Sequence, residues 1–362
     1  MARTLVVGGT GPTGPHIVAG LEARGHDVTV CHTGAHELPE VAHLPHLHGD
    51  VRDPAALHEM LGATEWDVAV VTYGRLRAIA EVLAGRVGHL VSVGGAPAYR
   101  GYFDPGRWNP PGMPVPTRED APTSTSDDDG KSYRIVATEE AVFAHHPTAT
   151  HFRYPFVYGP RQLVPREWCI VRRILDGRPH IVVPDGGAIA HTFGFTENLA
   201  HAVLLAVDRP GDAAGRIFNC GDDEVLTLRQ VIDICATELD HEWELISMPA
   251  ELAVPARPLL MQPTSDHRVL DTAAVREVLG YRDLVPARTA VARTARWLAD
   301  HPADSATEAI LEDPFDYANE DRLIAAWTNA IGGLPELDWP SPPGYGLAYA
   351  GPGATRARRP GL

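Results

Sequence analysis

The 362-residue sequence predicts an α/β protein with a doubly wound parallel sheet and a smaller C-terminal lobe. Short apolar β-branched runs alternate with helical patterns along the first 160 residues, which is typical of parallel βαβ units. A glycine-rich turn follows the first of these runs directly. The hydrophobic share of 44% is enough for a sizeable core.

Periodicity places the individual elements. Strands are predicted at 4–7, 26–31, 46–50, 66–71, 89–93 and 148–157, with helices at 15–24, 53–61, 76–83, 133–145 and 168–175. Further helices are predicted to begin near Thr196 and Leu228, and two more lie within 270–299. The stretch 101–131 is rich in Gly, Pro and Asp and predicts a long surface loop of the kind that covers a substrate.

The amino-acid composition argues against several classes of function. The formal charge of −16 argues against a nucleic-acid partner, because affinity for phosphate backbones comes from Lys and Arg. Four scattered cysteines without a CxxC pair fit a reducing cytoplasm, and neither a signal peptide nor a membrane-spanning run is expected. We predict no metal site, because no carboxylate or cysteine completes a set with His43, His46 and His48.

The first turn has the pattern GxxGxxG between a strand and a helix. Glycines let the backbone approach a pyrophosphate, and the helix N-terminus supplies unpaired N–H groups. The turn therefore predicts a dinucleotide site rather than a bare tight turn. The predicted cofactor contacts are Gly8, Thr10, Gly11, Pro12, Thr13 and Gly14 in the turn, His32 at the end of the second strand, and Asp50 and Val51 at the end of the third.

The end of the second strand bears on the choice of cofactor. An acid there binds the ribose hydroxyls of NAD, whereas an Arg suits the extra phosphate of NADP. This chain has Cys31-His32-Thr33-Gly34, which gives neither signal. The cofactor is predicted to be NAD(P), and the missing acid favours NADP.

The domain organisation follows from these elements. Residues 1–160 form a predicted dinucleotide-binding domain to which 193–222 return, and 161–192 with 223–300 form a predicted substrate lobe. An added helical segment is predicted at 301–340. The Pro/Gly-rich stretch 341–362 is predicted to be a disordered tail.

Several motifs together resemble the extended short-chain dehydrogenase/reductases, also called NAD-dependent epimerase/dehydratases. They are Val6 to Gly14, Gly49 to Asp53, Arg153 to Arg161, Phe218 to Gly221 and Asp271 to Tyr281. The resemblance covers about residues 3–300. It implies a Rossmann sheet, a small polar or cyclic metabolite as substrate, and a homodimer.

The catalytic set departs from the family pattern, which has a Ser after the fifth strand and Tyr-x-x-x-Lys on the following helix. The Ser position falls near Gly95, and Ser92 comes too early. One register of the helix puts Tyr133 at the tyrosine and Ala137 at the lysine. The other register puts Lys131 at the tyrosine and Ile135 at the lysine.

Lys131 and Tyr133 are the predicted catalytic residues. Lys131 is the sole lysine among 31 basic residues, although the composition suggests a genome that replaces Lys by Arg. A partly buried ammonium could donate a proton. The alternative is a solvated lysine at a helix start, and Tyr133, two residues on, lines the site or simply packs.

Four residues are predicted to contact substrate. They are Tyr99, Arg161, Trp168 and His191. Arg161 follows a strand end and suits an anionic group. For Trp168 and His191, packing in the core is the competing interpretation.

Three functional hypotheses follow. The leading one is an NAD(P)-dependent oxidoreductase or epimerase-like enzyme that transfers hydride at a carbinol or carbonyl. The second is a non-redox lyase, isomerase or cyclase on the same fold, which the missing Tyr-x-x-x-Lys favours. The third is a dinucleotide-sensing protein. The predicted substrate lobe argues against it, because a sensor does not need one.

Overall fold

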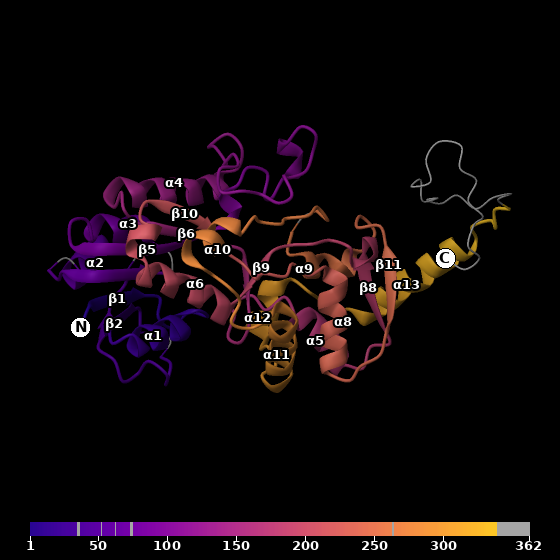
Figure 1. Cartoon of the computed structure of the whole chain (residues 1–362). Coiled ribbons are helices and arrows are strands. Elements are labelled where there is room, and N and C mark those ends of the chain that lie inside the picture. Colours follow the sequence, from indigo (N-terminus) through magenta and orange to yellow (C-terminus); the bar gives the residue numbers. More distant parts are fainter. Residues whose placement is uncertain (35–36, 52, 62, 73–74, 263, 339–362) are drawn as a thin grey trace, which may run out of the picture. The chain divides into compact units, whose positions relative to one another are not determined.

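The central sheet is parallel throughout and has seven strands (Figure 1). The fold comes from a computed structural model that describes residues 1–338 apart from 35–36, 52, 62, 73–74 and 263. In spatial order the strands are β10 (Arg216–Asn219), β6 (Thr150–Tyr154), β5 (Val87–Gly95), β4 (Trp66–Val71), β1 (Arg3–Val7), β2 (Asp27–His32) and β3 (His46–His48). The strand order changes direction between β1 and β4, and in open parallel sheets ligands bind at that point.

Helices cover both faces of this sheet. On one face lie α1 (Gly14–Ala23) and α6 (Thr196–Asp208), and on the other lie α2 (Pro54–Leu61), α3 (Leu76–Val82) and α4 (Gly130–His145). Successive strand residues point to opposite faces, so Val6 packs with Ile17 while its neighbour Leu5 packs with Leu57. The predicted doubly wound α/β fold is confirmed.

The single strand predicted at 148–157 is two strands. Pro155 interrupts it, since proline has no N–H for the ladder. After the break, β7 (Phe156–Tyr158) leaves the main sheet and pairs with β9 (Phe193–Phe195). A second two-stranded sheet, β8 (His180–Pro184) with β11 (Glu244–Met248), was missed by the sequence analysis.

The remaining helices follow the sheet in the chain. They are α5 (Trp168–Leu175), α7 (Pro210–Ala213), α8 (Leu228–Glu238), α9 (Arg257–Leu260), α10 (Ala273–Leu279), α11 (Ala287–Asp300), α12 (Ser305–Leu311) and α13 (Tyr317–Gly332). Residues 1–316 form one compact unit, and α13 belongs to a second. The predicted tail 341–362 lies outside the described residues. Within the described part of the chain, no helix is both long and apolar enough to span a membrane.

The loop predicted at 101–131 is packed against the body and ends earlier than expected. Tyr102 and Met113 share a small core with Leu270, and Thr117 makes a bridge with that residue. Helix α4 begins at Gly130, three residues before the predicted start, because the Asp129 carboxylate accepts hydrogen bonds from the first backbone N–H groups.

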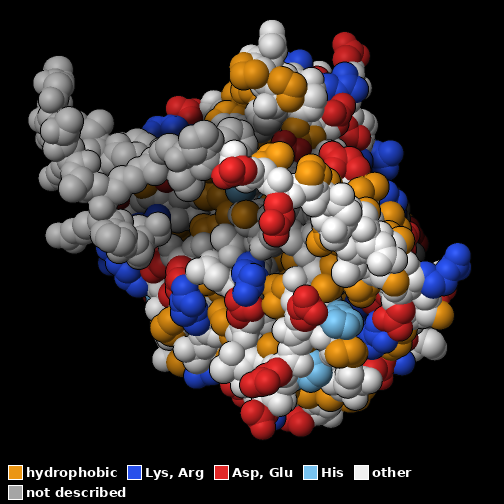
Figure 2. All heavy atoms as spheres, turned by 90° about the vertical axis from the view of Figure 1, so that its right-hand side faces the viewer, with side chains coloured by type: hydrophobic (Ala, Val, Ile, Leu, Met, Phe, Trp, Pro, Cys, Tyr) orange, Lys and Arg blue, Asp and Glu red, His pale blue; other side chains and the backbone are white. Residues whose placement is uncertain are grey.

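The surface charge is mixed on the face drawn in Figure 2. Acidic side chains lie among basic and hydrophobic ones there. The acidic side chains on that face therefore do not form one continuous acidic patch.

Candidate functional site

The first turn leaves α1 with an open N-terminus at the switch in strand order. Gly8 has a φ of 92°, and the Gly11 and Gly14 N–H groups donate to Gly8 and Gly11 carbonyls at 3.0 Å each. A Cβ on Gly14 would lie 2.3 Å from the Gly9 carbonyl oxygen, so the turn itself requires glycine there. A Cβ on Gly11 would meet only the Gly8 oxygen, at 3.3 Å, and would otherwise face open space.

A large cavity of about 1090 Å³ lies next to this turn. It is walled by the turn, the end of β5, the packed loop and one face of α4. Its lining includes Pro12, Thr13, Thr72, Arg75, Arg77, Gly94, Gly95, Tyr102, Phe103, Lys131, Arg134, Ile135, Thr138, Tyr154 and Gln162. The structure thus places Pro12 and Thr13, two predicted cofactor contacts, and Lys131, a predicted catalytic residue, in the lining of one pocket.

The charge of this pocket is positive. Arg75, Arg77, Lys131 and Arg134 line it, and none of its described lining residues is acidic. Arg75 has a φ of 65°, a backbone conformation that costs free energy for a side chain with a Cβ and that is frequent at functional sites. Such a lining suits an anionic ligand, because the cations interact with it at short range in a partly enclosed space.

Helix periodicity explains which residues of α4 reach the pocket. Lys131, Arg134, Ile135 and Thr138 are spaced at i, i+3, i+4 and i+7, which places them on one face. The Lys131 Nζ lies 4.6 Å from the centre of the Phe103 ring. Tyr133 is half-buried and outside the lining. The sequence analysis missed Arg134 and Thr138, although their spacing from Lys131 is a signal for them.

The hydroxyl groups near the pocket have other partners. Ser92 is buried and its Oγ lies 2.8 Å from His151 Nδ1, while Gly94 and Gly95 form the pocket wall. Burial raises the pKa of Tyr102 to about 12. Burial also raises the pKa of Tyr154, whose hydroxyl donates to the Leu199 carbonyl at 3.0 Å. Neither phenol is therefore an effective proton donor or acceptor near neutral pH.

Three of the predicted substrate residues lie outside the pocket lining. Tyr99 is fully buried and donates to Asn219 Oδ1 at 2.6 Å, with the Arg153 guanidinium stacked over its ring. Arg161 is exposed and pairs with Glu40. His191 lines two small cavities instead, and burial lowers its pKa to about 3.

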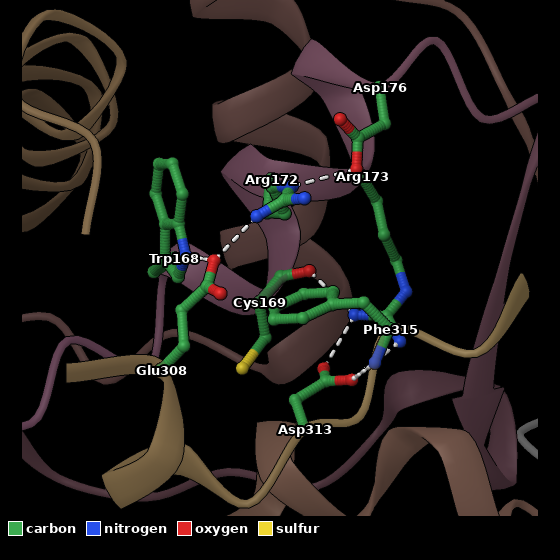
Figure 3. Close-up of polar contacts among 8 residues, drawn as sticks. All are labelled: Trp168, Cys169, Arg172, Arg173, Asp176, Glu308, Asp313 and Phe315. Atoms are coloured by element: carbon green, nitrogen blue, oxygen red, sulfur yellow. Dashed lines mark hydrogen bonds and ion pairs between the residues drawn. The ribbon is translucent and has the colours of Figure 1, made fainter. Parts of the chain in front are cut away.

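Trp168, the fourth, is also buried away from the pocket and belongs to a polar cluster that joins α5 to the α12 segment (Figure 3). Its Nε1 donates to Glu308 at 2.9 Å, and Arg172 donates to the same carboxylate at 2.6 Å. In the same cluster Arg173 forms a buried two-pronged ion pair with Asp313 at 2.7 and 3.2 Å, with Phe315 beside it. These contacts make Trp168 a packing residue of the lobe.

The remaining predicted cofactor residues follow the neighbouring strand ends. His32 ends β2, is 8% exposed, and has its pKa lowered by burial. Asp50 and Val51 follow β3 and are half-buried or exposed. None of the three lines the large cavity, so the predicted cofactor residues extend from the cavity along the carboxyl ends of β1, β2 and β3.

Comparisons with known proteins agree with this geometry. Residues 4–81 match the profile of the "NAD dependent epimerase/dehydratase family". The chain is 28% identical over 188 residues to the uncharacterized protein YbjS of Escherichia coli K12, covering 46% of this chain and 56% of that protein. It is also 28% identical over 240 residues to a 3-diazoavenalumate denitrifying reductase of Streptomyces sp, covering 61% and 76%.

A solved structure extends the likeness over most of the chain. The Bordetella bronchiseptica enzyme WbmH in complex with NAD+ has a TM-score of 0.64 and 19% identity, covering 84% of this chain and 100% of that one. At this identity the likeness shows the fold. By contrast, the sequence match between this chain and YbjS covers only about half of the length of YbjS, 56%.

Proposed function

We propose a dinucleotide-dependent reaction for this chain, whose residues 4–81 match the profile of the NAD-dependent epimerase/dehydratase family. The reaction is hydride transfer at a carbinol or carbonyl of a small polar or cyclic metabolite, alone or within an epimerisation or elimination. One observation carries the proposal: Lys131, on the helix where the family has its proton-transferring tyrosine, lines the large pocket together with Gly95.

The first turn fits the cofactor pyrophosphate. Gly8 and Gly11 leave the approach to the α1 N-terminus without a side chain, and a Cβ on Gly11 would project into that approach. The positive end of the α1 dipole would face the phosphate oxygens, with Thr10 and Thr13 alongside. When bound, the nicotinamide supplies the acceptor or donor of hydride.

Lys131 would carry the proton that accompanies the hydride. A lysine ammonium carries a proton at neutral pH and would donate it when hydride is added to a carbonyl, while Ile135 occupies the position of the family lysine. The Phe103 ring, 4.6 Å from Nζ, would hold the ammonium at the pocket wall. Tyr133 lies off the pocket face, which favours Lys131 over Tyr133 as the proton carrier.

The preferred cofactor is proposed to be NADP, since β2 ends at His32 without a carboxylate at the position that binds the NAD ribose. We expect NADPH to bind more tightly than NADH in a fluorescence titration. Tighter binding of NADH would contradict this preference. The homodimer is also a proposal, and sedimentation equilibrium at several protein concentrations tests it.

A non-redox lyase, isomerase or cyclase is the second candidate. The observation that favours it is the replacement of the family Ser and Tyr-x-x-x-Lys by Gly95, Lys131 and Ile135. Stopped-flow absorbance distinguishes the two, because oxidised and reduced nicotinamide absorb differently. Hydride transfer predicts a transient or lasting absorbance change during turnover, whereas non-redox chemistry forms product without one.

Cofactor binding is tested with Gly11→Ala, whose added Cβ would meet only the Gly8 carbonyl oxygen, at 3.3 Å, and would obstruct the pyrophosphate. Gly130→Ala is the matched control, because a Cβ there meets nothing within 4 Å. We expect NADPH affinity to fall by at least about tenfold, or 1.4 kcal/mol, in Gly11→Ala and to stay unchanged in Gly130→Ala. Equal affinity of Gly11→Ala and the unaltered chain would overturn the assignment of the turn.

A further inference from the structure

A cluster of three histidines and one glutamate lies at the edge of the sheet, outside the lining of the large pocket. His32 ends β2, His46 and His48 are in β3, and Glu37 lies in the connection between them. His48 is the register partner of His32, and His46 is two residues before His48. Residues two apart on a strand share a face, so the parallel pair directs all three imidazoles to one side.

The nitrogen and oxygen atoms converge on one point. Each residue offers one ligand atom, and all four atoms lie within 4.8 Å of one another. His32 Nε2 is 2.6 Å from His46 Nδ1, and His48 Nε2 is 3.1 Å from Glu37 Oε1. The Glu37 oxygens are 3.7 Å from His32 Nε2 and from His46 Nδ1. Zn–N bonds of about 2.0–2.1 Å place tetrahedral ligand atoms about 3.3–3.5 Å apart, within this range.

The surroundings of His46 orient it as a ligand. Its Nε2 donates to the Val41 carbonyl oxygen at 2.9 Å, which leaves Nδ1 without a proton and aimed at the cluster. A backbone carbonyl on the second ring nitrogen is the usual support of a metal-bound histidine.

His32 is held differently. The Gly34 N–H lies 3.2 Å from His32 Nδ1, a contact that fits a metal-free chain of hydrogen bonds from Gly34 through His32 to His46. Metal binding through Nε2 would move the His32 proton to Nδ1 and break the Gly34 contact. The same atoms can therefore adopt two arrangements, and metal binding selects between them.

Burial makes half of the cluster rigid and half accessible. The side chains of His32 and His46 are 6% and 11% exposed, whereas those of His48 and Glu37 are 51% and 48% exposed. Two ligands are thus fixed by the sheet, and two can close over an ion that enters from solvent. The sequence analysis predicted no metal site because it considered His43 with His46 and His48, and it missed His32 and Glu37, which the fold brings in.

We propose that His32, Glu37, His46 and His48 form a binding site for a divalent transition-metal ion of the zinc class. Three imidazoles and one carboxylate suit Zn²⁺, Co²⁺ or Ni²⁺, and lack the oxygen-rich set that Mg²⁺ or Ca²⁺ needs. The ion would fasten the β2–β3 connection to the three-residue edge strand β3. The proposal does not depend on the proposed hydride transfer.

The test uses the full chain, made without a histidine tag and stripped with a chelator. Zn²⁺ is titrated by calorimetry, and Co²⁺ is titrated by visible absorption, which reports tetrahedral coordination. The variants are His46→Ala and the more exposed His48→Ala and Glu37→Gln. His43→Ala is the matched control, because this histidine lies on the same connection but pairs with Glu22 at 2.7 Å.

We expect about one Zn²⁺ per chain, a tetrahedral Co²⁺ spectrum, and a rise in Tm on adding Zn²⁺. Affinity should fall by at least about tenfold in the three cluster variants and stay unchanged in His43→Ala. Substoichiometric binding to the unaltered chain would overturn the proposal, as would an equal loss in His43→Ala. If His46→Ala fails to fold, the half-exposed His48 and Glu37 variants decide the result.

Discussion

Helices α4 and α5 both carry cations, but the cations have different surroundings. Lys131 and Arg134 in α4 line the large pocket and form no ion pair with any described residue. Arg172 and Arg173 in α5 are held by carboxylates at the C-cap of α5, in α12 and in the segment after α12. A cation beside an open cavity without acids is placed for a ligand, whereas a cation already paired with carboxylates of the protein is part of the fold.

The same contrast separates Trp168 from Lys131, although the sequence analysis predicted both as site residues. Trp168 shares the Glu308 carboxylate with Arg172 and so belongs to the contact between α5 and α12. Lys131 contacts an aromatic ring at the pocket wall. We therefore infer that α4 is the ligand-facing helix and α5 a structural one.

The largest expected loss of stability is at Asp313. Replacing Asp313 by Ala removes the carboxylate that pairs with the buried Arg173, and losing one member of a buried ion pair typically costs about 3–5 kcal/mol of the free energy of unfolding. Urea denaturation followed by circular dichroism measures the loss. Glu308→Ala, at a side chain that is 22% exposed, should lose less. A change below about 1 kcal/mol in Asp313→Ala would show that this pair does not hold the lobe together.

The next largest effect is on ligand binding through α4. Arg134→Ala should weaken NADPH or another anionic pocket ligand by about tenfold, because a charge-assisted contact of about 1.5 kcal/mol is lost. Arg172→Ala removes a cation from α5 and should leave that affinity unchanged. Fluorescence titration of the two variants measures the difference directly. If Arg172→Ala weakens binding as much as Arg134→Ala, the distinction between the helices fails.

The smallest effect is a pH dependence at Asp283. Burial raises the pKa of Asp283 from 3.8 to about 6, and its oxygens accept from the Asp223 N–H and the Tyr281 hydroxyl rather than from a cation. Between pH 4 and 6 the folded chain thus binds more protons at this site than the unfolded chain does, so lowering the pH stabilises it.

Asp283→Asn removes that dependence while keeping an oxygen acceptor. The variant should have a higher Tm than the unaltered chain above pH 6, and the difference should shrink as the pH falls towards 4. Differential scanning calorimetry at several pH values measures it. A difference that is constant with pH would contradict a raised pKa at Asp283.

Local sequence patterns were sufficient to predict the strands of the seven-stranded sheet and the first turn. The short apolar runs of β1 and β4, the GxxGxxG spacing and the helical pattern of α5 at Trp168–Leu175 are properties of neighbouring residues, which the sequence displays directly. The break at Pro155 was readable in principle, since proline cannot continue a ladder. Strands β8 and β11 were missed because each is a short apolar run whose pairing partner lies far along the chain.

The site was harder to predict because it depends on contacts distant in sequence. Tyr99 follows a strand end as a pocket residue would, yet Asn219 and Arg153 enclose it. The cation Arg75 reaches the pocket from the connection after β4, and no pattern marks it. By contrast, the pocket face of α4 follows from helix periodicity once Lys131 is placed on it.

The most direct test compares Lys131→Met with Tyr133→Phe. Turnover is followed by nicotinamide absorbance, with a substrate identified by mass among the molecules that co-purify with the chain, and NADPH affinity is measured in parallel. We predict that Lys131→Met lowers kcat by about a hundredfold to ten-thousandfold with cofactor affinity nearly intact, while Tyr133→Phe turns over normally. Loss of turnover in Tyr133→Phe with Lys131→Met still active would contradict the account.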